Sequence, residues 1–74
     1  MIDKTDLKGK YVTFKDNDGK MRTERVVKVY SSHLTVRHFI TLNGRTIKFP
    51  KHRIHKNQVI GRQFPKKGIE EINW

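Results

Sequence analysis

Basic side chains and a histidine are concentrated in residues 44–54, a stretch that contains four Lys or Arg residues and no acid. Side chains of these types bind phosphate, because Lys and Arg carry positive charge and donate several hydrogen bonds. Ile47 and Phe49 alternate with polar residues, which predicts a strand with one buried face, and Pro50 ends that strand because proline has no N–H for the ladder. Binding groups are common where strands end, so this stretch is a candidate phosphate-binding site.

The charge of the whole chain supports the same chemistry. Seventeen Lys and Arg residues outnumber seven Asp and Glu residues, which gives a net charge of +10. No acid lies between Arg25 and Ile69, although that stretch holds eleven basic residues and four histidines. Protein surfaces normally mix the two signs, so a single-sign field predicts a polyanionic partner, most often nucleic acid. The alternative that stays open is a small protein that merely carries excess lysine.

Cations and one aromatic ring share the outer face of the predicted sheet. Lys28, Arg37, Phe39 and Lys48 fall on it, with threonines between them. Lys and Arg neutralise phosphates, and a ring can stack on a base. In the alternative, Phe39 packs under the C-terminal tail. The predicted nucleic-acid-binding residues are Lys28, Arg37, Phe39, Arg45, Lys48, Lys51, His52, Arg53 and Lys56.

The sequence predicts no enzyme, no metal site and no cofactor. A hydrolase needs a carboxylate to orient its histidine, and none lies between residues 25 and 69. Asp16 and Asp18 fall in a predicted turn. His52 and His55 would point to opposite faces of a strand, and there is no cysteine to complete a metal site. His38 is expected on the inner face, as a core or rim histidine.

Five strands with tight turns are expected to position these residues. Asp16-Asn17-Asp18-Gly19, Ser31-Ser32 and Asn43-Gly44 are turn sequences. Residues 1–8 read as a lead-in or one helical turn. The predicted strands cover residues 10–15, 20–30, 33–42, 46–49 and 58–63.

Two hairpin registers follow from these turns. A type I′ turn at Asn43-Gly44 places apolar side chains opposite each other. It pairs Leu42 with Arg45, Ile40 with Ile47, and Phe39 with Lys48. A turn at Ser31-Ser32 pairs Val29 with Leu34, Val27 with Val36, Lys28 with Thr35, and Val26 with Arg37. The expected inner face of the third and fourth strands consists of Leu34, Val36, Ile40, Leu42, Ile47 and Phe49.

The remainder of the chain is expected to close the fold. After Pro50, a 3₁₀ turn through residues 51–53 would bring Ile54 into the core. Gly61 is expected to form a bulge or kink in the last long strand. Residues 64–68 are predicted to be a loop, and residues 69–74 a helical turn or a final strand.

These elements predict an all-β fold. Five short strands in about 60 residues are too few for a sandwich and suit a small, strongly bent barrel. The ending Phe49-Pro50 with Ile54 four residues later resembles the last strands of SH3-like barrels, where a 3₁₀ turn after the proline leads into the final strand. The resemblance implies a single domain, 1–74, with a five-stranded SH3-like barrel at about 9–63 and a short C-terminal tail at 64–74.

A second resemblance rests on Gly44-Arg45-x-Ile47 followed by Pro50-x-His52-Arg53-Ile54, with Gly61 seven residues further on. This pattern is similar to the small domain proposed to recognise cyclic-phosphate RNA ends, in which an Ile-Pro-x-His-Arg-Ile segment follows a Gly-containing hairpin. The preceding strands of that family also run Tyr-x-x-Phe/Tyr-x-Asp, as Tyr11 to Asp16 do here. The chain departs from the family at Asn57 and at Pro65, where the closing Trp would fall. The resemblance implies that His52 and Arg53 face a phosphate.

The expected compartment and the expected lack of a membrane partner rest on features that are missing from the sequence. Without cysteines, a signal-peptide pattern or an apolar run of roughly 18 residues, a cytoplasmic protein with no membrane partner is expected. The leading hypothesis is a barrel that binds DNA or RNA mainly through phosphate contacts. The alternative is a basic module that docks on an acidic protein surface of a nucleic-acid machine such as RNA polymerase or the ribosome. The third hypothesis is an RNA-end-processing accessory.

Overall fold

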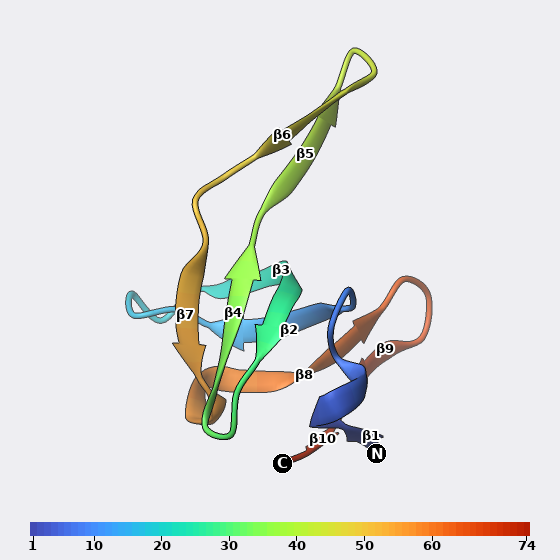
Figure 1. The fold of residues 1–74 in the computed structure, drawn as a ribbon. Helices are drawn as coiled ribbons and strands as arrows, with labels where there is room; N and C mark the ends of the chain where they lie inside the picture. The colour runs from blue at the N-terminus through green and yellow to red at the C-terminus, as the bar shows by residue number, and fades with distance from the viewer.

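The computed structural model describes all 74 residues as strands and turns, with two 3₁₀ turns and no α-helix (Figure 1). The elements are, in chain order, β1 (Ile2–Asp3), η1 (Lys4–Asp6), β2 (Tyr11–Lys15), β3 (Met21–Val29), β4 (His33–Arg37), β5 (Phe39–Leu42), β6 (Arg45–Lys48), β7 (His52–His55), η2 (Lys56–Gln58), β8 (Val59–Phe64), β9 (Gly68–Glu70) and β10 (Ile72–Asn73). The predicted all-β class is confirmed. Neither 3₁₀ turn has the length and apolar character needed to cross a membrane.

Six strands form the main sheet, in the order β7-β4-β3-β2-β8-β9, and every neighbouring pair is antiparallel. The sheet is bent, because in Figure 1 β4 and β7 run steeply across the direction of β2 and β8. Its two edge strands, β7 and β9, do not pair with each other, so the sheet is open. Two further pairs stand apart from it: β1 with β10, which is parallel, and β5 with β6.

The core lies on the inner side of this bend. It consists of Leu7, Val12, Phe14, Val26, Leu34, Val36 and Ile54. The predicted inward positions of Leu34, Val36 and Ile54 are confirmed. Residues 1–8 contain the single helical turn that the sequence allowed, and Leu7 directly after it is fully buried. The turn reverses the chain, because Leu7 N donates to Lys4 O and Lys10 N donates to Leu7 O.

The β3–β4 hairpin contains a β-bulge that the predicted register lacks. Two predicted pairs are confirmed: Val29 with Leu34, and Lys28 with Thr35. The register then shifts, so that the observed pairs are Val26 with Val36 and Arg25 with Arg37. The predicted pairs Val27–Val36 and Val26–Arg37 are therefore wrong. The bulge lets Val26 enter the core, where it is 1% exposed, and it places Glu24 on the same inner face.

The β5–β6 hairpin has the predicted register but not the predicted burial. All three predicted pairs are confirmed: Leu42 with Arg45, Ile40 with Ile47, and Phe39 with Lys48. Asn43 and Gly44 both have positive φ, 51° and 75°, as a type I′ turn requires. The predicted strand 33–42 ends at Arg37, however, and β5 and β6 project from the body as an arm (Figure 1).

Four side chains on this arm and its base were wrongly expected in the core. Ile40, Leu42, Ile47 and Phe49 are 38%, 57%, 44% and 41% exposed. The alternation of apolar and polar residues predicted the strands correctly, but it cannot tell whether another layer exists for the apolar face to pack against. Here β2, β3, β4 and β7 already enclose the core, and no layer remains for the arm.

The segment after Pro50 is a strand and not the predicted 3₁₀ turn. β7 pairs with β4 through His52–Val36, Arg53–Thr35, Ile54–Leu34 and His55–His33. The 3₁₀ turn comes later, as η2, where His55 and Gln58 form a reciprocal capping box. Ile54 still reaches the core, at 2% exposed, because it alternates with Arg53 along β7.

In the C-terminal part, the predicted strand near 58–63 is confirmed as β8. Of the two alternatives for residues 69–74, the structure has strands and not a helical turn. β8 is bulged where it passes β2: Thr13 pairs with Gly61, and Phe14 pairs with Val59. The predicted irregularity at Gly61 is thus confirmed. β9 extends the main sheet beside β8, and β10 pairs with β1. Ile72 and Trp74 pack against the core.

Candidate nucleic-acid interface

Four cations from three neighbouring strands share the outer face of the main sheet. In one register row, Arg25 of β3 lies opposite Arg37 of β4. In the next row, Lys28 of β3, Thr35 of β4 and Arg53 of β7 lie side by side. We call Arg25, Lys28, Arg37 and Arg53 the cationic face. Neighbouring strands are about 4.8 Å apart, so the backbones that carry these four charges are close to one another.

The charges of the cationic face are not compensated within the protein. The salt bridges join Met1 to Glu70, Arg22 to Asp16 and Glu24, and His52 to Glu24, and none of them includes a residue of this face. Like charges directly opposite each other in a sheet are destabilising, so the Arg25–Arg37 pair costs stability in the free protein. The Nε of Arg37 is also buried without a hydrogen-bond partner.

Aromatic rings lie beside these cations. The Arg25 guanidinium lies over the ring of Phe39, 5.6 Å from its centroid, and the Lys28 ammonium lies 5.2 Å from the centroid of Tyr30. Tyr30 stacks in turn on His33, with ring centroids 4.2 Å apart. Phe39 therefore packs beneath a cation. It does not pack under the C-terminal tail, which lies at the other end of the molecule from β5 (Figure 1).

The other predicted phosphate-binding residues are spread over the arm and both ends of β7. Arg45 lies beside the arm tip, and Lys48 lies opposite Phe39 at the arm base. Lys51 is exposed in the link between β6 and β7. Lys56 lies in η2, at the far end of β7, where its N–H donates to Ser32 O. The arm residues thus continue from the cationic face, whereas Lys56 does not.

His52 is placed differently from the prediction. It lies on the inner face of β7 beside Val36, and Arg53 lies on the outer face beside Thr35. The two residues that the RNA-end resemblance placed together at a phosphate therefore point to opposite sides of the strand.

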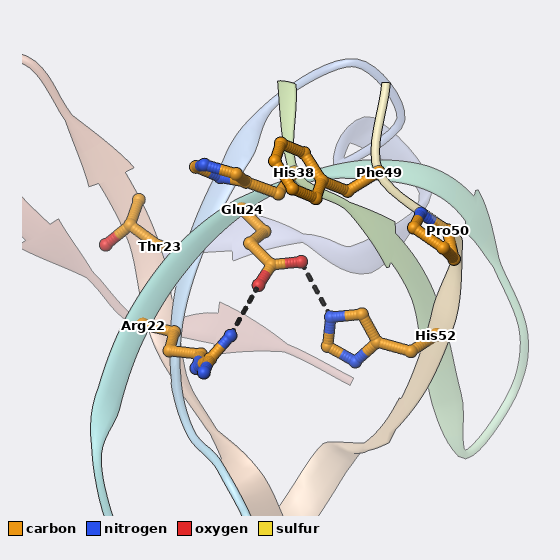
Figure 2. Close-up of a pocket in the computed structure, with 7 residues that line it drawn as sticks. All are labelled: Arg22, Thr23, Glu24, His38, Phe49, Pro50 and His52. Carbon is orange, nitrogen blue, oxygen red and sulfur yellow. Dashed lines mark hydrogen bonds and ion pairs between the residues drawn. The ribbon is translucent and has the colours of Figure 1, made fainter. Parts of the chain in front are cut away.

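The partner of His52 is the buried carboxylate of Glu24. His52 Nε2 donates to Glu24 Oε1 over 2.6 Å, and Glu24 is 4% exposed. Arg22 Nη1 lies 3.8 Å from Glu24 Oε2, and Arg22 Nε donates to Asp16 Oδ2 over 2.8 Å. Figure 2 shows Glu24 between Arg22 and His52, in a cleft of about 400 Å³. The other residues that line the cleft are Thr23, His38, Phe49 and Pro50.

This cleft can orient a histidine, but it lacks a free nucleophile. Glu24, directly before the acid-free stretch, supplies the orienting carboxylate that is missing between residues 25 and 69. A catalytic triad would also need a hydroxyl in reach. The only hydroxyl side chain that lines the cleft, Thr23, is hydrogen-bonded to Thr13 Oγ1 over 2.8 Å. No three His, Asp or Glu side chains lie together as a metal site.

Asp16 fixes the turn next to this cleft. Its carboxylate accepts hydrogen bonds from the backbone N–H groups of Lys20 and Asp18 and from Arg22. The Lys20 bond is the largest of the effects that hold the pKa of Asp16 below its ordinary value of 3.8. The turn that the sequence predicted therefore also positions Arg22 beside Glu24.

Three residues of the site were missed from the sequence: Arg25, Tyr30 and Glu24. Arg25 joins the cationic face only because of the bulge in β3. The adjacent apolar pair Val26-Val27, which interrupts the alternation of the strand, is the signal that could have revealed the bulge. Glu24 pairs with a residue 28 positions away, and no local pattern indicates such a contact.

We expect the titration of His33 to report the positive potential of the cationic face. Burial, followed by the charges of Arg53 and His55, lowers the pKa of His33 from its ordinary 6.5. Replacing Arg53 with Gln should raise this pKa, whereas Lys67→Gln, on the distant tail, should not; an NMR titration measures both. A lowered folded-state pKa means that the stability linked to His33 is present above pH 6.5 and is lost as the pH falls through the lowered pKa. Equal pKa values in wild type and Arg53→Gln would contradict the assignment.

Comparison of the chain with protein-family models, with curated proteins and with solved structures finds no match.

Proposed function

We propose that this protein binds nucleic acid through the cationic face, mainly by contacts to phosphate. The observation that carries the proposal is the register of β3, β4 and β7, which aligns Arg25 with Arg37 and Lys28 with Arg53 while no acid pairs with any of them. Such an arrangement is unfavourable in the free protein and becomes favourable when a polyanion covers it.

The chemistry of this face favours backbone contacts over base recognition. Arg and Lys are the residues that neutralise phosphates, and Thr35 between Lys28 and Arg53 can donate a further hydrogen bond to a phosphate oxygen. Binding through this face should therefore depend strongly on salt and weakly on sequence.

The fold that presents this face is proposed to be an SH3-like barrel built from β2, β3, β4, β7 and β8. Support comes from the order of these five strands in one bent sheet and from η2, a 3₁₀ turn that leads from β7 directly into β8. The main sheet itself is open, so the barrel would be an incompletely closed one. Nuclear Overhauser contacts between backbone protons of β7 and β8 would test whether the two strands approach each other.

The test of the function is a salt series. Neutralising about four to six phosphates predicts that log K falls with log salt with a slope of about −3.5 to −5.5 on duplex DNA. The variant Arg25→Gln/Arg37→Gln/Arg53→Gln should flatten the slope by up to about 3, because it removes three of these contacts. The matched control, Lys20→Gln/Lys66→Gln/Lys67→Gln, makes the same change in net charge at exposed sites away from the face and should flatten the slope by less than 1.

The two triple variants separate a site from a general charge effect. If both flatten the slope equally, the protein binds through its net charge and the cationic face has no special role. If the face variant binds as wild type does, the proposal is wrong. Melting curves should show that both variants stay folded, since none of the six side chains is part of the apolar core.

A further inference from the structure

The β5–β6 arm is a two-stranded ribbon whose faces are both open to solvent. No third strand pairs with it, and every arm residue except Phe39 at its base is exposed. At its base, Phe49 N donates to His38 O over 3.0 Å, and the two rings pack with centroids 5.1 Å apart. The arm is thus held to the body at a defined point, beside the cationic face, and projects beyond it (Figure 1).

We propose that this arm lies in the major groove of B-form DNA and reads base edges there while the cationic face contacts the neighbouring phosphates. The proposal rests on the nucleic-acid binding proposed above, and it specifies the ligand as double-stranded DNA. Two strands about 4.8 Å apart, with side chains on both sides, form a ribbon that the major groove, about 12 Å wide and about 8.5 Å deep, can admit. Four residues per strand at about 3.4 Å each give the arm a reach that exceeds this depth.

The arm tip carries the side chains that read bases in this groove. Asn43 and Arg45 flank Gly44 at the turn, and both are exposed. An asparagine amide can pair with N6 and N7 of adenine, and an arginine guanidinium with O6 and N7 of guanine. Neither side chain is engaged elsewhere, because no hydrogen bond or salt bridge in the structure includes the side chain of Asn43 or Arg45.

The apolar side chains of the arm fit the same ligand. Ile40, Leu42 and Ile47 alternate along one face and are all more than a third exposed, although the body offers no surface to cover them. The C5-methyl group of thymine is an apolar contact that only the major groove offers. A DNA groove with A·T pairs can therefore cover this face while Arg45 and Asn43 contact polar edges beside it.

The geometry discriminates against RNA. The major groove of A-form RNA is deep and narrow, and side chains cannot read it, while a single strand has no groove. Lys48 at the arm base and Arg25 over Phe39 lie where the ribbon joins the cationic face. With the arm in the groove, these cations would contact the phosphates that border it. The cations around the arm would also suit an acidic protein surface, so docking on a protein is one outcome of the test.

The test compares three oligonucleotides with one arm variant. The variant Leu42→Ser/Arg45→Gln/Ile47→Thr changes only exposed side chains and keeps the Asn43-Gly44 turn. Fluorescence anisotropy on a mixed-sequence duplex DNA, the corresponding duplex RNA and single-stranded DNA should show at least tenfold preference of wild type for duplex DNA. The arm variant should lose about 10- to 100-fold on duplex DNA and less than about threefold on the other two.

Chemical footprinting identifies the groove. Wild type should protect guanine N7 from methylation, whereas the arm variant should not, and replacing thymine by uracil should weaken wild-type binding to duplex DNA. If the arm variant binds duplex DNA as wild type does while the cationic-face variant does not, the arm inference is wrong and the proposed function stands; an arm that docks on a protein gives this result. If both variants bind as wild type does, the proposed function itself is wrong.

Discussion

Replacing His52 with alanine is expected to destabilise the protein by about 3 kcal/mol, because it leaves the buried carboxylate of Glu24 without its closest hydrogen-bond donor. Leaving a buried polar group without its hydrogen-bond partner typically costs about 1–3 kcal/mol, and more for a charged group, so we take about 3 kcal/mol for the carboxylate of Glu24, which is 4% exposed. The second partner, Arg22, is 3.8 Å from the carboxylate and cannot replace a bond of 2.6 Å. Free energies of unfolding from urea denaturation measure the effect.

Two further variants separate the lost bond from the lost ring. His52→Gln keeps an N–H donor and should recover part of the stability. Arg53→Ala removes the next side chain of β7, on the exposed outer face, and should change stability by less than about 1 kcal/mol. If His52→Ala and Arg53→Ala have similar free energies of unfolding, another group must satisfy the Glu24 carboxylate. The Glu24–His52 pair then does not stabilise the contact between β3 and β7.

The Glu24–His52 pair lies next to the point where the arm leaves the sheet. Glu24 and His52 come from β3 and β7, on either side of β4, and close the inner face beside Val36. Directly beyond this point, His38 and Phe49 pack on each other and the arm begins. The cleft in Figure 2 thus lies where the main sheet ends and the arm begins.

Local patterns in the sequence predicted the hairpins well, because a hairpin register depends only on its turn and on the alternation beside it. The Asn43-Gly44 turn predicted the β5–β6 pairs correctly, and the Ser31-Ser32 turn predicted the two β3–β4 pairs nearest to it. The bulge at Val26-Val27 then shifted the rest, since burial of Val26 outweighs regular pairing. Because the bulge was not predicted, the position of Arg25 on the cationic face was not predicted either.

What the sequence did not predict depends on contacts between distant segments. Whether Ile40 and Ile47 are covered depends on the presence of a further layer, which their own alternation does not reveal. The carboxylate that holds His52 comes from 28 residues earlier. Lys28 and Arg37 lie on the outer face, as the alternation along their strands predicted. The register of β7, which the sequence did not predict, places Arg53 on that face and turns His52 inward.

The largest backbone effect is expected at Gly61, where replacement with alanine should destabilise the protein by about 3 kcal/mol. A Cβ at this position would overlap the backbone carbonyl of Glu70 and lie 2.5 Å from Ile69 Cγ2. Since a carbonyl cannot turn aside as a flexible side chain can, β9 must separate from β8, and the pairs Arg62–Glu70 and Gln63–Ile69 are lost or strained.

The control for this prediction is Gly44→Ala, at the arm tip, where an added Cβ meets nothing within 4 Å and only the positive φ of 75° is unfavourable. That variant should cost about 1 kcal/mol. Adding Ile69→Ala to Gly61→Ala should relieve only the side-chain overlap and leave most of the loss, because the Glu70 carbonyl still blocks the new Cβ. Urea denaturation gives the free energies, and hydrogen exchange should show loss of protection confined to β8 and β9 at low denaturant. A loss at Gly61→Ala no larger than at Gly44→Ala would mean that β9 does not lie against Gly61 in solution.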